Sequence, residues 1–181
     1  GRIRIAGHDL LEAPRAAKAA MGYLPEQPPV YRELTVDEYL DYCAALHRLA
    51  RPQRKSARDT AKERCGLTEV GRRLIGNLSK GYQQRVGLAQ AIIHLPPVII
   101  LDEPTVGLDP IQIREIRHLI RDLGQEHGVI LSTHILPEVQ ATCDQVQIIN
   151  KGQLVLNDSI AGLSHHMQSA ALSVALRRAP D

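Results

Sequence analysis

A run of four apolar residues followed by two adjacent carboxylates constrains this chain more than any other feature. Residues 98–101 read Val-Ile-Ile-Leu, and Asp102, Glu103 and Pro104 follow at once. A short, continuous apolar run predicts a strand buried on both faces, as in a parallel sheet. Open α/β sheets bind their ligands at the carboxyl ends of such strands. The run therefore predicts a ligand site at Asp102 and Glu103, against the simpler alternative of an acidic turn.

Strand patterns alternate with helix patterns on both sides of this run. Residues 21–25 predict a short strand, and residues 128–131 predict a second strand buried like residues 98–101. Helices are predicted from Ser79 to about His94 and over residues 109–123, each with a capping residue at its start. This alternation predicts an α/β fold with a mostly parallel sheet.

A purely helical block interrupts the alternation. Thr35 to Ala50 predicts one helix, with Thr35 and Glu38 as its capping box. Residues 51–64 predict a second, strongly basic helix. Its cations could face anionic lipid headgroups, although such a run is more often a solvated helix face. Together with Arg48 just before this helix, the cations are Arg51, Arg54, Lys55, Arg58, Lys62 and Arg64.

The charge balance excludes some classes of partner. The 181 residues hold 22 Lys and Arg against 20 Asp and Glu, a net charge of only +2. A dedicated nucleic-acid binder carries a basic footprint, so we expect no nucleic acid as partner. The apolar run at residues 98–101 is far too short to span a bilayer. The three cysteines are odd in number and far apart, which favours reduced thiols over a disulfide frame.

Three further motifs accompany the acidic pair. Residues 78–85 read Leu-Ser-Lys-Gly-Tyr-Gln-Gln-Arg and open a helix, whose free N–H groups and dipole suit a phosphate. Gly107-Leu108-Asp109 follows the acidic pair after a short loop. Ser132-Thr133-His134 ends the next strand, which places His134 at the same edge as Glu103. Taken singly, these are an ordinary helix cap and a structural or solvated histidine.

In this order the four motifs resemble the signature, Walker B, D-loop and H-loop of the nucleotide-binding domain of ATP-binding cassette (ABC) transporters. The resemblance implies a P-loop NTPase (RecA-like) core with a mostly parallel sheet and an all-helical ABC subdomain. Residues 80–90 and 133–139 look most like ABC-2 type exporters, and among these they resemble the gliding-motility-associated branch. The implied division is a partial ATPase core with the Q-loop (1–34), the helical subdomain (35–77), the ATPase core (78–160) and the start of a C-terminal accessory region (161–181).

The resemblance also implies roles for individual residues. Glu103 would be the catalytic base that positions water, His134 would contact the γ-phosphate, and Asp102 would hold Mg²⁺. Asp109 would couple the two sites of a dimer, and Glu26 would also be able to hold Mg²⁺. The residues implied to bind ATP, either across a dimer or through the Q-loop, are Ser79, Gly81, Gln83, Asp109, Glu26 and Gln27.

Two features depart from the family pattern. No G-x-x-x-x-G-K-[ST] motif occurs in the sequence. We therefore expect the chain to be an N-terminally incomplete part of a longer protein, lacking Walker A and inactive alone. The glutamine of the Q-loop falls on Glu26 if residues 23–25 are the anchor, while Gln27 comes next. Which of these two residues fills the role is open.

The resemblance implies an ATP-hydrolysing subunit that drives export through a transmembrane permease. ATP and Mg²⁺ would be the cofactors, and a second ABC subunit would complete a homodimer or heterodimer. The protein would be cytoplasmic and peripheral on the inner face of the cell membrane. One alternative is a non-transport ABC ATPase, although the tandem cassettes or coiled-coil insertions typical of that class are not seen. Another is a non-catalytic module that lends Ser79 and Gly81 to a complete partner cassette.

Overall fold

The computed structural model describes residues 1–163. It divides into two compact units, Gly1–His134 and a second unit that begins at Ile135, which are treated separately below. From residue 164 on, the expected C-terminal accessory region lies outside the described residues. The functional labels expected for the parts of the chain stay a prediction.

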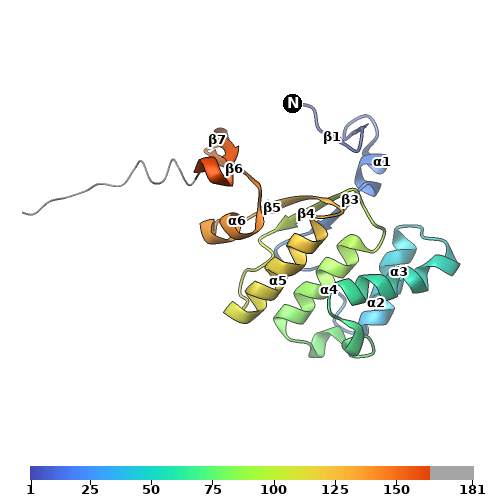
Figure 1. Ribbon diagram of the computed structural model, residues 1–181. Coiled ribbons are helices and arrows are strands. Elements are labelled where there is room, and N and C mark those ends of the chain that lie inside the picture. Colours follow the sequence, from blue (N-terminus) through green and yellow to red (C-terminus); the bar gives the residue numbers. More distant parts are fainter. Residues whose placement is uncertain (164–181) are drawn as a thin grey trace, which may run out of the picture. The chain divides into compact units, whose positions relative to one another are not determined.

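The first unit is built on a parallel sheet of three strands. The order is β3 (Met21–Leu24), β4 (Val98–Asp102) and β5 (Gly128–Ser132), side by side in Figure 1. Leu24 pairs with Leu101, and Leu101 pairs with Leu131. All three strands therefore end at one edge of the sheet, as the sequence predicted.

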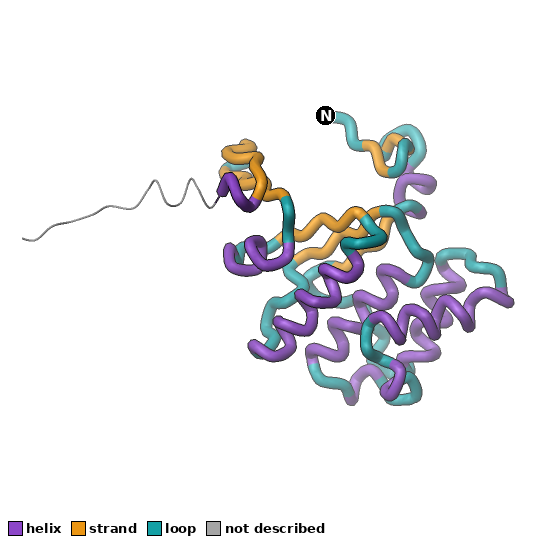
Figure 2. The backbone as a smooth tube through the Cα atoms, in the orientation of Figure 1, coloured by secondary structure: helices purple, strands orange, loops and turns teal. Residues whose placement is uncertain are grey.

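The two faces of this sheet differ. Ile99 and Leu101 are fully buried, whereas Ile130 is 58% exposed and Tyr23 is 45% exposed. Figures 1 and 2 show the helices of residues 36–123 gathered on one side of the sheet, whereas the short helix of residues 14–19 lies apart from them. The expectation that residues 98–101 and 128–131 are buried on both faces is therefore wrong. Successive strand residues point to opposite faces, and among the described residues only one face is fully covered.

Helix α4 (Lys80–Ile92) packs very closely on β3. A Cβ atom at Gly22 would overlap the carbonyl oxygen of Ala91, and one at Gly87 would lie 2.6 Å from Cδ1 of Leu24. Gly87 and Ala91 are four residues apart, so they share one face of the helix. The side chain of Gln90 adds a hydrogen bond of 2.8 Å to the carbonyl of Tyr23. Small residues on both sides allow the helix backbone to reach the strand.

Helices α2 (Val36–Leu46) and α3 (Arg51–Arg64) form the expected helical block. The predicted capping box of α2 is confirmed: the N–H of Glu38 donates to Oγ1 of Thr35, and the N–H of Thr35 donates to the carboxylate of Glu38. Helix α2 ends at Leu46 rather than near Ala50, because Arg48 takes a left-handed φ of 60°. Two short 3₁₀ turns, η1 (Thr68–Val70) and η2 (Ile75–Asn77), lead from α3 to α4.

Helix α5 (Pro110–Leu123) begins as the sequence predicted. Oδ1 of Asp109 accepts hydrogen bonds from two backbone N–H groups of its first turn, and a proline stands at its start. Ile116, Ile120 and Leu123 are buried on one side of this helix. Arg85 of α4 pairs with the carboxylate of Glu115 at 2.7 Å and so ties α4 to α5.

A short hairpin lies near the N-terminus, in which β1 (Arg4–Ile5) pairs antiparallel with β2 (His8–Asp9). Ala6 and Gly7 both take positive φ and form a tight turn, so the chain reverses at once. A short helix, α1 (Pro14–Ala19), leads from this hairpin to β3.

The second unit contains α6 (Leu136–Thr142) and a hairpin of β6 (Gln145–Asn150) and β7 (Gln153–Ser159). Lys151 and Gly152 form the turn of this hairpin, and both take positive φ. No helix within residues 1–163 is long and apolar enough to cross a membrane.

Candidate functional site

Glu103 stands at the carboxyl end of β4 in a constrained backbone conformation. Its φ is 46°, in the left-handed region that residues other than glycine rarely adopt. Its N–H donates to the carbonyl of Ser132 at 2.9 Å, which extends the pairing of β4 with β5 by one residue. Such uncommon backbone angles cluster at functional sites, because the surrounding structure must hold them.

His134 fixes one oxygen of the Glu103 carboxylate. The backbone N–H of His134 donates to Oε1 at 3.1 Å, and Nδ1 of the ring lies 2.7 Å from the same oxygen. The Glu103 side chain is only 18% exposed, whereas that of His134 is 74% exposed. The other oxygen, Oε2, is buried and accepts no hydrogen bond from any residue that the structure describes. A buried carboxylate oxygen without a partner requires an explanation, and a catalytic role is one of the recognised ones.

Asp102, the expected metal ligand, is the last residue of β4. It pairs in register with Ser132 and is half-buried at the same edge of the sheet as Glu103. Within residues 1–163 no three His, Cys, Asp or Glu side chains are placed to share a metal ion. Mg²⁺ is usually held by one or two carboxylates together with phosphate oxygens and water. The donor chemistry of Asp102, a carboxylate one residue before Glu103 at the same edge of the sheet, fits that ion.

Glu26 and Gln27, the two Q-loop candidates, are exposed in a bend just after β3. Leu24 pairs with Leu101, so Glu26 and Glu103 both stand two residues beyond a paired position. The structure therefore places both candidates at the carboxyl edge, where the acidic pair lies. It does not separate the role of Glu26 from that of Gln27.

The signature residues Ser79 and Gly81 lie at the start of α4. Oγ of Ser79 accepts from the N–H of Tyr82 at 3.4 Å, which confirms Ser79 as the helix cap. Gly81 is buried, and a Cβ atom there would lie 2.6 Å from Cδ of Gln112. The contact with Gln112 of α5 carries no signal in the sequence, because the two residues meet only in the folded chain.

Gln83 makes two bonds that sequence reasoning missed. Its side-chain amide donates to the carbonyls of Leu78 at 3.0 Å and Ile75 at 3.2 Å. These bonds hold the segment that leads into α4. Its assignment as a nucleotide-binding residue stays a prediction.

The D-loop touches the signature motif. Gly107 has a φ of 70°, and a side chain there would overlap the amine of Lys80. Asp109 is exposed and uses Oδ1 to cap α5, with bonds of 2.9 Å to two backbone N–H groups. The site residues thus form two groups, the Glu103–His134 pair and the contact between signature and D-loop. Their meeting around one shared triphosphate needs a second chain and stays a prediction.

Comparisons with known proteins decide the family. Residues 1–106 match the model of the family described as ABC transporter. The chain belongs to the ABC transporter family. The ABC chain is 32% identical to the uncharacterized ABC transporter ATP-binding protein YxlF of Bacillus subtilis (strain 168), over 98% of this chain and 58% of that protein. It is 38% identical to the bacitracin transport ATP-binding protein BcrA of Bacillus licheniformis, over 86% of this chain and 50% of BcrA.

A solved structure described as the ATP binding subunit of an ABC transporter superimposes with a TM-score of 0.78. The two sequences are 28% identical, and the superposition covers 96% of this ABC chain and 72% of the solved one. The predicted α/β P-loop NTPase fold is therefore confirmed, and ATP is the nucleotide that ATP-binding domains of this family bind. The chain spans little more than half the length of YxlF and half that of BcrA.

Proposed function

We propose that this chain is part of an ATP-hydrolysing subunit of an ABC exporter. The observation that carries the proposal is the Glu103 carboxylate, with Oε1 held by His134 and a buried Oε2 without a partner. The family membership and the ATP-binding names of the relatives support the same conclusion.

The geometry suits activation of water. Oε2 of Glu103 accepts a hydrogen bond from a water molecule and orients it for in-line attack on the terminal phosphate. His134 keeps the carboxylate from rotating, because two of its groups hold the same oxygen. In its charged form the imidazole also offers Nε2–H to a phosphate oxygen. Asp102 would hold Mg²⁺, and that ion, when bound, neutralises charge on the phosphate oxygens.

The second group of residues would act on the nucleotide of another subunit. Ser79 is exposed at the positive end of α4, which favours a phosphate brought by a second ABC subunit. Gly81 and Gln83 would complete that contact, and Asp109 would couple the two sites through its place beside the signature motif. Glu26 or Gln27 would link the Mg²⁺ and the attacking water to the partner permease.

The transport role rests on the relatives. The name of BcrA describes an ATP-binding protein of bacitracin transport, and the motifs of this chain resemble ABC-2 type exporters and the gliding-motility-associated branch. We therefore assign a transmembrane permease as partner and the cytoplasmic face of the membrane as location. A homodimer or heterodimer with a second ABC subunit completes the assembly.

The test supplies a P-loop segment ahead of the chain and measures ATP hydrolysis and ATP binding. Glu103→Gln is expected to lower turnover by about 100-fold or more while ATP binding is retained. Glu69→Gln is the matched control, because Glu69 is exposed and lies in η1, away from the site residues. Full turnover by the Glu103→Gln protein would remove Glu103 from its role. The chain without a P-loop segment is expected to bind ATP weakly or not at all.

Co-purification separates the transport role from the first alternative. A multi-span membrane protein bound to the P-loop-supplied chain would support the exporter, whereas ribosome or DNA association would support a non-transport ABC ATPase. Restored hydrolysis would exclude the purely non-catalytic module.

A further inference from the structure

A basic hollow lies on the helical block, between α2 and α3. Its volume is about 310 Å³. Its lining residues, called the basic hollow below, are Asp41, Arg51, Arg54, Lys55 and Arg58. None of them takes part in the site formed by Glu103 and His134. Asp41 comes from α2 and the four cations come from α3.

The charges of the basic hollow are not balanced. Its one carboxylate, Asp41, is bound by Nη1 of Arg58 at 2.8 Å. Arg54 donates from Nε to the carbonyl of Leu49 at 3.0 Å, which orients its guanidinium without neutralising it. Arg51 and Lys55 are exposed and form no ion pair with any residue in the described part of the chain. Three positive charges therefore lack a counter-charge around one concave surface.

The start of α3 adds to this positive potential. The helix begins at Arg51, its N-cap residue Ala50 offers no side-chain acceptor, and its first turn holds no acidic residue. Helices normally place acids at this end, because the unbonded N–H groups and the dipole make it positive. The first turns of α3 instead carry three cations, Arg51, Arg54 and Lys55, whose charges are repelled by the positive end of the helix dipole. A bound anion would relieve this repulsion and accept bonds from all of these groups.

We propose that the basic hollow binds a phosphate group. Arg51, Arg54, Lys55 and Arg58 are spaced by three, one and three residues, so they line one face of α3. Guanidinium groups bind phosphate oxygens in pairs, and a lysine ammonium adds a point charge. The phosphate comes from a lipid headgroup or from a soluble phosphate compound, and both present the same chemistry. The site depends on the charges of α3 and not on ATP hydrolysis.

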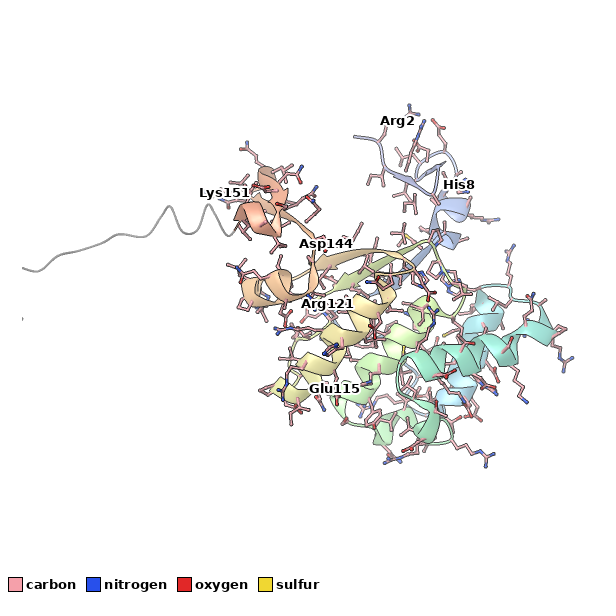
Figure 3. The ribbon with its side chains drawn as sticks, viewed as in Figure 1. Arg2, His8, Glu115, Arg121, Asp144 and Lys151 are labelled. Carbon is pink, nitrogen blue, oxygen red and sulfur yellow. The ribbon has the colours of Figure 1, made fainter. Side chains whose placement is uncertain are left out.

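The test compares two double variants of the chain that remove equal charge. Arg51→Gln with Lys55→Gln removes two of the three cations of the hollow that lack a counter-charge. Arg114→Gln with Arg121→Gln is the matched control, because both residues are exposed on α5, where Figure 3 labels Arg121. Circular dichroism checks that both variants keep their helices.

Binding is measured to phosphatidylcholine vesicles with and without phosphatidylglycerol, and separately to inorganic phosphate by calorimetry. The hollow variant is expected to bind its ligand about 30-fold more weakly than the wild type, and the control close to the wild type. If the hollow variant loses binding only to the vesicles that contain phosphatidylglycerol, the ligand is a lipid headgroup. If it loses binding to inorganic phosphate, the ligand is a soluble phosphate compound. If both variants bind the ligand equally weakly, binding depends only on general surface charge, and the proposal is overturned. A wild type that binds neither probe would overturn it as well.

Discussion

Replacing Gly22 by alanine should destabilise the first unit severely, because α4 leaves no room for a side chain there. The new Cβ would overlap the carbonyl oxygen of Ala91 and lie 2.9 Å from its carbonyl carbon. Pro96 Cγ would stand 3.2 Å away on another side. The obstacle is helix backbone, which cannot rotate aside as a flexible side chain can.

The size of the effect follows from that overlap. Carbon and oxygen in close contact normally lie about 3.3–3.6 Å apart, so α4 or β3 must shift by on the order of 1 Å. Overpacking of a core costs about 1–3 kcal/mol and occasionally more. Because Leu24 and Ile99 are fully buried beside this contact, a shift disturbs their packing as well. We expect a loss of about 3 kcal/mol, or a fall in Tm of roughly 10 °C.

Gly128→Ala is the matched control in the same sheet. A Cβ atom at Gly128 would meet only the carbonyl oxygen of Pro97, at an ordinary distance of 3.5 Å. Alanine also restricts the unfolded chain, so Gly128→Ala should be neutral or stabilise by about 0.4–1 kcal/mol. Urea unfolding followed by circular dichroism measures both variants. Equal stability of the two proteins, or a stabilised Gly22→Ala, would refute the reasoning from close approach.

Three further predictions concern the helical block and its surroundings. Leu40→Ala should cost about 2–5 kcal/mol of unfolding free energy, because Leu40 is fully buried, whereas Leu46→Ala on the same helix, at a side chain 63% exposed, should stay within about 0.5 kcal/mol. Hydrogen bonds from Thr35 lower the pKa of Glu38, so the ionised carboxylate stabilises the fold above pH 4.5 and this effect is lost as the pH falls through the lower pKa of the folded state. The free energy of unfolding of Glu38→Gln should therefore differ from that of the wild type at neutral pH, and the difference should vanish in acid. Burial lowers the pKa of His94 to about 4, so as the pH falls His94 is protonated in the unfolded chain before it is protonated in the folded one. Stability should therefore fall as the pH drops from about 6.5 toward 4. Tm measured across this range should fall less steeply in His94→Gln than in the wild type.

The family and much of the secondary structure could be predicted from the sequence. Thr35 with Glu38, and Asp109 with Pro110, mark helix starts through contacts between residues at most three positions apart. The apolar run of β4 likewise predicts its strand. The burial of the strands could not be predicted, because apolar composition is the same whether one face is covered or two. The end of α2 was also missed, since a positive φ angle at Arg48, an ordinary residue, decides it.

For the candidate site, the sequence by itself determined which chemical groups are present and at which strand ends they stand. Asp102, Glu103 and His134 follow apolar runs, and a parallel sheet brings such ends to one edge. Only the tertiary structure decided that His134 binds one oxygen of Glu103 and leaves the other buried without a partner. It also decided that Gly22 lies against the backbone of α4, which is far along the chain, and therefore has no room for a side chain. The reason is physical: capping and strand patterns depend on neighbours in sequence, whereas these contacts depend on how separate elements pack.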